Sequence, residues 1–443
     1  MKFYIHKLGC PKNDVDADYI TARLIAAGHQ PVSSPDRADS VIVNTCGFIL
    51  PAKEESIDAI LALGKRKKAG EFSNLYAAGC MAQRYGDQML AEMPELDGAF
   101  GHGVLEELTS AVSDSKRLKE CVRIETRKLG YLDWTNRFIS DELPYAYLKI
   151  SDGCNRACSF CAIPGIRGTY RSRPVESIIN EARFLAENGK KELILVSQEA
   201  TLYGYDLKDG SNLLSLLEQL ENVAGVQWVR LLYLHPAQMS PELIGHMTSG
   251  GKTLSYFDLP LQHINDDILA GMQRQTSRRQ IESVLDSIRS ADSDAVIRTA
   301  FIVGFPGETD QQFGELTGFV EQVEFDRLGV FTFSPEDDTP AALMDRQLSE
   351  EVKAARMDEL MSLQQEIAFA KNNSLIGSVK EVIIDSVSGE DGAVGRTRGD
   401  CPEIDQQVFV FGDNLKIGDI HRVAIESADG YDLKGTVDRE GKK

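Results

Sequence analysis

The chain of 443 residues has no run of apolar residues near the 18 or so that a membrane-spanning helix needs. Residues 1–20 also lack the basic start and apolar centre of a secretory signal. Both absences favour a cytoplasmic protein without membrane contact. Hydrophobic residues make up 42% and charged residues 26%, which is ordinary for globular proteins. The length predicts two or three domains.

Basic charge is scarce as well. The chain has 48 Lys and Arg against 68 Asp and Glu, a formal net charge of −20. A general nucleic-acid binder presents a basic face, so this balance argues against that class and suits a small-molecule or basic protein partner. Net charge alone leaves RNA open, because a local basic groove can lie on an acidic chain.

Cysteine is too rare for a disulfide scaffold, with eight in the whole chain. Cysteines that cluster in a cytosolic enzyme more often indicate metal binding or catalysis. Six of the eight fall into two groups of three, which are described below. The other two, Cys121 and Cys401, have no comparable context and are interpreted as structural.

The first hundred residues alternate apolar runs with amphipathic stretches, which indicates βα units and a parallel sheet. A cysteine stands just past each predicted strand: the strands are 2–8, 40–45 and 74–78, and the cysteines are Cys10, Cys46 and Cys80. In open parallel sheets, ligands bind in the crevice beyond the carboxyl ends of the strands. We therefore expect these thiols to meet at one edge, where three of them on a cluster would leave one iron open.

A second βα series predicts a partial barrel with its active face at the carboxyl ends of its strands. Its six strands are 145–150, 192–196, 227–234, 255–261, 295–303 and 327–333. Beyond residue 377 the runs are short and β-type, at 379–384, 392–397, 408–411 and 421–427, which predicts a small all-β barrel. Between the two series, residues 103–141 lack clean periodicity. The fold class is α/β, and the domains are an amino-terminal parallel βα domain (1–115), a connector (116–140), a partial (β/α)6 barrel (141–374) and the all-β barrel (375–443).

The strongest chemical signal is Cys-x-x-x-Cys-x-x-Cys at Cys154, Cys158 and Cys161, in the loop after the first barrel strand. This is not a usual zinc spacing, and no fourth Cys or His stands nearby in sequence to close a zinc site. Three thiolates on a 4Fe–4S cluster leave one iron open. That iron can bind the amino and carboxylate groups of S-adenosylmethionine (SAM), and an electron then breaks the S–C bond to give a 5′-deoxyadenosyl radical. Buried structural cysteines are the plain alternative.

In this three-cysteine motif and the barrel that carries it, the chain resembles the radical SAM superfamily. The residues around the other cysteines resemble the methylthiotransferases of that superfamily, in particular the branch that acts on a ribosomal protein. The matching segments are Lys7–Asn13, Asn44–Phe48, Gly79–Arg84 and Asp400–Asp405. The tRNA-modifying relatives usually carry Gln-Met rather than Pro-Lys after the first cysteine, and Ser rather than Gly after the second. Cys401 departs from the family, which mostly has a small apolar residue there.

This resemblance covers essentially the whole chain and implies a second 4Fe–4S cluster on Cys10, Cys46 and Cys80, a radical SAM barrel and a carboxyl-terminal TRAM domain of the OB-like type. The implied reaction is methylthiolation of the β-carbon of an aspartate in small-ribosomal-subunit protein twelve. One SAM methylates sulfur held on the second cluster, and another supplies the radical, with electrons from an external donor.

Charge favours this substrate over tRNA. Residues 375–443 hold 14 Asp and Glu and 9 Lys and Arg, a net of −5. A TRAM domain that holds tRNA needs basic residues for phosphates, whereas acidic charge complements a basic ribosomal protein.

The SAM contacts are less defined. Gln198 and Gln262, after the second and fourth barrel strands, are placed to reach SAM, or else they satisfy backbone groups. Gly304, in the segment 304–308, resembles the adenine-contacting turn of the superfamily, and Phe160 contacts SAM or shields the cluster from water. Three arginines follow the cysteine loop, namely Arg167, Arg171 and Arg173. They pair with an anionic substrate group or are solvated.

Two other functions stay open at this point. One is a methylthiotransferase acting on tRNA adenosine with the same clusters. The other is a non-catalytic iron–sulfur or zinc protein that carries electrons or acts as a scaffold.

Overall fold

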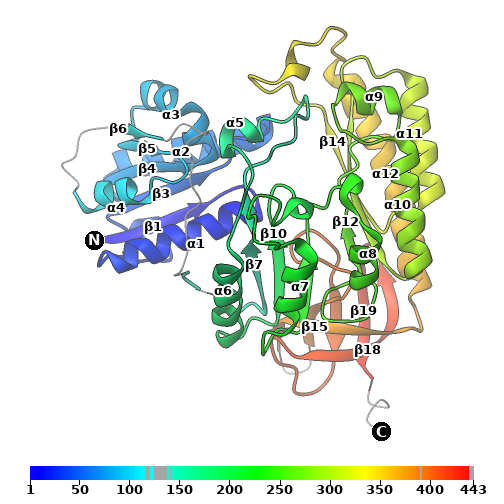
Figure 1. The fold of residues 1–443 in the computed structure, drawn as a ribbon. Helices are drawn as coiled ribbons and strands as arrows, with labels where there is room; N and C mark the ends of the chain where they lie inside the picture. Colours follow the sequence, from blue (N-terminus) through cyan, green and yellow to red (C-terminus); the bar gives the residue numbers. More distant parts are fainter. Residues whose placement is uncertain (115–119, 124–136, 140, 390–391, 439–443) are drawn as a thin grey trace.

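The computed structural model describes residues 1–114, 120–123, 137–139, 141–389 and 392–438. The chain forms an amino-terminal α/β layer, a central βα barrel and a carboxyl-terminal β-barrel (Figure 1). This confirms the predicted fold class. Most of the predicted connector, 116–140, lies outside the described residues. Among the described helices, none combines the length and apolar character that crossing a membrane requires.

The amino-terminal sheet has six parallel strands in the order β2-β1-β3-β4-β5-β6. The strands are β1 (Lys2–Lys7), β2 (Gln30–Pro31), β3 (Ser40–Thr45), β4 (Asn74–Gly79), β5 (Gly98–Phe100) and β6 (Glu120–Val122), and the helices are α1 (Pro11–Ala26), α2 (Leu50–Lys68), α3 (Cys80–Glu92) and α4 (Leu105–Ser113). The central strands β3 and β4 are buried along their whole length, because helices cover both faces of the sheet. The three predicted strands are confirmed. Helix α4 and strand β6 lie in the stretch where no periodicity was found.

The central barrel consists of two parallel three-stranded sheets, β7-β10-β11 and β12-β13-β14. Its strands are β7 (Tyr145–Lys149), β10 (Glu192–Val196), β11 (Trp228–Leu231), β12 (Tyr256–Asp258), β13 (Val296–Val303) and β14 (Arg327–Thr332), and a short ladder pairs β8 (Ser151–Asp152) with β9 (Arg171–Ser172). The helices are α5 (Ile163–Arg167), α6 (Val175–Glu187), α7 (Leu213–Glu221), α8 (Pro241–Met247), α9 (Asp266–Gly271), α10 (Arg278–Ala291), α11 (Asp310–Val323) and α12 (Glu350–Ser374). All six predicted strands are confirmed.

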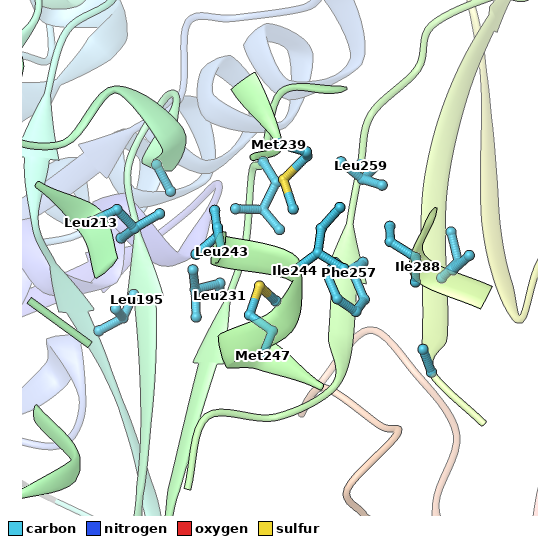
Figure 2. Close-up of a cluster of buried hydrophobic side chains, with 14 of the residues drawn as sticks. Leu195, Leu213, Leu231, Met239, Leu243, Ile244, Met247, Phe257, Leu259 and Ile288 are labelled. Atoms are coloured by element: carbon cyan, nitrogen blue, oxygen red, sulfur yellow. The ribbon is translucent and has the colours of Figure 1, made fainter. Parts of the chain in front are cut away.

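Apolar side chains between these strands and their outer helices form one continuous core. Figure 2 shows Leu195 of β10, Leu231 of β11 and Phe257 of β12 facing Ile244 and Met247 of α8. Burial of such side chains contributes about 25 cal/mol per Å² of apolar surface removed from water. This core fixes the strands whose carboxyl ends carry the site.

The carboxyl-terminal domain is a closed barrel of five strands in the order β15-β16-β17-β19-β18. They are β15 (Val379–Ser388), β16 (Gly392–Thr397), β17 (Val408–Phe411), β18 (Ile420–Asp429) and β19 (Asp432–Val437), of which β19 was not predicted. The segment between β16 and β17 packs against the amino ends of the central strands, where Cys401 is fully buried. The small barrel therefore closes the end of the central barrel opposite the cysteine loop (Figure 1).

Candidate active site

Three cysteines follow three neighbouring strands of the amino-terminal sheet. Cys10 follows β1 and caps α1, Cys46 follows β3, and Cys80 follows β4 as the first residue of α3. Cys46 packs so closely on Gly9 that a Cβ added at Gly9 would lie 2.9 Å from the Cys46 Cβ, so the position requires glycine. Burial, reinforced by Cys80 and Cys10, raises the pKa of Cys46 to about 12. The structure thus brings the three thiols of this set together.

Asn13 and Arg167 fix the surroundings of this set. Asn13 Nδ2 donates to the carbonyl oxygens of Leu8 and Thr45 at 3.0 Å each, which ties together the loops that follow β1 and β3. Its Oδ1 accepts a hydrogen bond from Arg167 Nη2 at 2.7 Å. The same Arg167 nitrogen lies 3.3 Å from Cys80 Sγ. Since Arg167 belongs to the central barrel, that barrel supplies a positive charge to a thiol of the amino-terminal domain.

Two of the three loop arginines differ from their prediction. Arg167 Nη1 pairs with Asp16 Oδ2 at 2.7 Å, and Arg173 pairs with Glu181. Both guanidiniums are buried, and internal carboxylates take up their charges. The prediction that these two side chains are solvated or await an anionic substrate is therefore wrong. Arg171 is half-buried and donates to two backbone carbonyl groups of its own loop.

The second set, Cys154, Cys158 and Cys161, lies in the loop that the β8–β9 ladder closes. A Cβ on Gly153 would lie 2.2 Å from the carbonyl oxygen of Thr169, so only glycine fits where the loop begins. A tight turn follows, in which the Cys161 amide donates to the Cys158 carbonyl oxygen at 3.1 Å. Burial raises the pKa of Cys154 to about 11 and that of Cys161 to about 12. Without metal these thiols are protonated at neutral pH, and a bound metal displaces the proton.

The donor chemistry of both sets fits iron–sulfur clusters. Within the described ranges, no three or more His, Cys, Asp or Glu side chains surround a point where one metal ion could lie. In a 4Fe–4S cluster each thiolate binds a different iron, so the ligands do not need to converge on one point. A cation stands beside each set: Arg167 is at Cys80, and Arg274 Nη1 lies 3.8 Å from Cys158 Sγ. Such cations suit sites that gain negative charge when thiolates and sulfide bind.

The two sets lie on the same side of the molecule. Helix α5 begins two residues after Cys161, and Ala162 and Ile166 of this segment pack against Cys80 in one small apolar cluster. Figure 1 shows α5 beside the amino-terminal domain, next to α3. The loop that carries the second set therefore also contacts the first set.

The predicted SAM-contacting residues lie at the same end of the central barrel as the cysteine loop. Gln198 follows β10, and its buried Oε1 has no hydrogen-bond partner among the described residues. Gln262 bridges to Phe301 of β13, which leads to Gly304. Phe160 packs on the apolar cluster that contains Phe305. Phe160 and Gln262 thus lie against the segment 301–305 that contains Gly304, whereas Gln198 follows a strand of the other three-stranded sheet.

Two polar residues near the first set, one buried and one half-buried, were not singled out from the sequence. Lys12 Nζ donates to the Ser197 carbonyl oxygen at 3.2 Å and lies 3.4 Å from the ring centroid of Tyr233. His102 is half-buried, and desolvation together with Arg167 lowers its pKa to about 3, so its imidazole is neutral. No motif around His102 marks it as part of the site, whereas Lys12 belongs to the Pro-Lys-Asn motif after Cys10.

Comparison with known families matches all three parts of the chain. Residues 148–320 match the radical SAM superfamily, residues 2–101 match an uncharacterized protein family, UPF0004, and residues 376–437 match the TRAM domain. Among solved structures, the radical SAM methyltransferase TsrM from Kitasatospora setae is similar, with a TM-score of 0.56 and 15% identity over 77% of each chain. The radical enzyme OxsB has a TM-score of 0.53 and 13% identity, covering 83% of this chain and 56% of its own. These likenesses concern the fold.

Curated relatives match along the full length. The ribosomal protein uS12 methylthiotransferase RimO of Clostridioides difficile (strain 630) is 41% identical, covering 99% of both chains. RimO of Acetivibrio thermocellus is 42% identical, covering 100% of this chain and 99% of the relative. With the radical SAM match, these relatives identify a sulfur-inserting transferase of the radical SAM type. The chain therefore belongs to the RimO family of radical SAM methylthiotransferases.

Proposed function

We propose that this chain replaces one hydrogen on the β-carbon of an aspartate in ribosomal protein uS12 with a methylthio group. The observation that carries the proposal is the full-length match to uS12 methylthiotransferases in a chain with two sets of three thiols at one end of its barrel. One set would suffice for SAM cleavage alone. A second set is needed where sulfur must also be held.

The target carbon explains why a radical is used. An aspartate β C–H is barely acidic because the adjacent carboxylate already carries negative charge, so general-base chemistry at neutral pH is ineffective. When bound, the two clusters and two molecules of SAM supply a methylated sulfur and a radical that abstracts the hydrogen directly.

The residues of the chain hold and orient these groups. Cys154, Cys158 and Cys161 hold the cluster that binds SAM, while Phe160, Gln198, Gln262 and Gly304 line the place for SAM. Cys10, Cys46 and Cys80 hold the second cluster. Packing of α5 against Cys80 keeps the two sets on one side of the molecule, so a single substrate side chain can reach both.

Charge and composition support the choice of partners. A chain of net charge −20 attracts a basic ribosomal protein and repels the phosphates of tRNA. An external reductant supplies the electrons. The ribosomal substrate implies that the protein works in the cytoplasm.

The test is an anaerobic reaction of the fully reconstituted chain with reductant, sulfide, SAM and a peptide that spans the target loop of uS12. Mass spectrometry should detect a methylthio group in place of one hydrogen on the aspartate. Formation of 5′-deoxyadenosine with no modified peptide or uS12, but with modified tRNA, would reject the proposed substrate. No 5′-deoxyadenosine from fully loaded protein would reject the radical reaction altogether.

A further inference from the structure

Buried cations in this protein are paired with carboxylates, with two exceptions among the described residues. The paired ones are Lys149 with Asp16, Lys190 with Asp141, Lys353 with Glu350, Arg167 with Asp16, Arg173 with Glu181, Arg230 with Glu192, Arg356 with Asp310 and Arg396 with Glu192. The exceptions are Lys12 and Arg274, each 8% exposed. Burying a charge without a counter-ion is costly, so an anion is expected at each when the site is filled.

Lys12 occupies the junction of the two domains. It belongs to the first turn of α1, two residues after Cys10, yet its Nζ reaches the carbonyl oxygen of Ser197 at 3.2 Å. The ring of Tyr233 covers another side of the ammonium, with its centroid at 3.4 Å. Ser197 follows β10 and Tyr233 follows β11, so the ammonium lies at the carboxyl ends of two barrel strands. An ammonium has three protons, and one carbonyl uses only one of them.

Each of the two sets of thiols has an arginine of its own beside it. Cys80 already has Arg167 at 3.3 Å, and Cys158 has Arg274 at 3.8 Å. Lys12 Nζ donates to a carbonyl oxygen and not to a thiol. The lysine reaches across the domain junction to the carboxyl ends of the barrel strands β10 and β11.

We infer that Lys12 binds the side-chain carboxylate of the substrate aspartate, an inference that rests on the proposed function. The β-carbon is bonded directly to the carboxylate carbon. An ion pair at the carboxylate therefore positions the reacting carbon between the two sets of thiols. It also selects against a neutral side chain, because asparagine would leave the buried ammonium unpaired.

The test uses two uS12 loop peptides that differ only in aspartate or asparagine at the target position. Each is titrated anaerobically onto the reconstituted full chain with SAM. Wild type should bind the aspartate peptide about tenfold to a hundredfold more tightly than the asparagine peptide. Lys12→Met should reduce this preference to within about twofold, and Lys12→Arg should keep part of it.

Lys190→Met is the matched control. Lys190 is also buried but has its own carboxylate partner, and it precedes β10, at the strand end opposite Ser197. This variant should keep the full preference. SAM affinity, measured in parallel, should be the same in all the variants.

Several outcomes would overturn the inference. A wild-type protein that binds both peptides equally, or a Lys12→Met variant that keeps the preference, excludes carboxylate recognition by Lys12. A variant that loads no iron at the amino-terminal set, or one that binds SAM weakly, assigns the lysine to the cluster or to SAM instead. Failure of the proposed function is distinct, because wild type then modifies neither peptide, and the inference falls with it.

Discussion

The two ends of the central barrel differ in how their polar side chains are paired. At the amino end, Glu192 lies between two guanidiniums, 2.7 Å from Arg230 and 2.8 Å from Arg396, and Tyr256 donates to Asp405 at 2.6 Å. At the carboxyl end stand two sets of thiols and the unpaired Lys12. At the amino end the buried charges pair with one another within the chain, whereas the carboxyl end carries thiols and an ammonium that no carboxylate of the described residues pairs. The same contrast separates the stability face from the active face of closed βα barrels.

The largest effects are expected when the thiols of one set are removed at a time. Changing Cys154, Cys158 and Cys161 to alanine should abolish SAM cleavage, because no iron is then open to SAM. Changing Cys10, Cys46 and Cys80 should abolish methylthio transfer and leave SAM cleavage intact. Both activities are followed by chromatography of 5′-deoxyadenosine and mass spectrometry of the peptide.

Cys121→Ala is the control for these variants, since Cys121 lies in β6, outside both sets. It should keep both activities. Loss of SAM cleavage in the amino-terminal triple variant would contradict the proposed division of roles.

At the amino end, Glu192→Gln should lower stability and leave the chemistry unchanged. The change leaves two buried guanidiniums without their shared carboxylate, which costs about 3–5 kcal/mol of unfolding free energy. Urea unfolding measures the loss, and the folded variant should still cleave SAM.

Glu381→Gln provides the matched surface comparison, because its pair with Arg398 at 3.0 Å is largely exposed. Its effect should stay below about 1 kcal/mol. An equal loss of unfolding free energy in the two variants would contradict the interpretation of the amino end as a structural network.

A subtler change tests the contact between the domains. Arg167→Met removes the guanidinium from Cys80 and from Asn13. Reconstituted iron should fall from about eight to about four per chain if the amino-terminal cluster depends on this contact. Spectra of the barrel cluster should be unchanged, and full iron content in the variant would show that Arg167 does not support that cluster.

The smallest expected effect concerns salt. The affinity for intact uS12 should fall several-fold between low and high ionic strength, since attraction between an acidic chain and a basic protein is screened. Fluorescence anisotropy of labelled uS12 measures this, and an affinity independent of salt would count against charge complementarity.

Sequence patterns predict the longer elements of this fold but not the short ones. Strands such as β10 are continuous apolar runs bounded by turns, so their limits are readable. Strands β5 and β6 have three residues each and carry no periodicity of their own. They form because a neighbouring strand offers hydrogen bonds, which a local pattern does not encode.

The same limit applies to the candidate site. The grouping of Cys154, Cys158 and Cys161 is local and visible in sequence. The pairing of Arg167 with Asp16 spans about 150 positions and two domains, so the arginine was predicted to pair with a substrate group or to be solvated. Lys12 was overlooked for the same reason, because only the three-dimensional structure shows that no carboxylate of the described residues pairs with its ammonium.

The most direct test of the account is an isotope transfer with a peptide deuterated at the β-carbon of the target aspartate. If the radical formed at the barrel set acts on the side chain held beside the amino-terminal set, deuterium should appear in 5′-deoxyadenosine in step with the methylthiolated product. A methylthiolated product accompanied by unlabelled 5′-deoxyadenosine would contradict the account, because the hydrogen would then have been removed by another group.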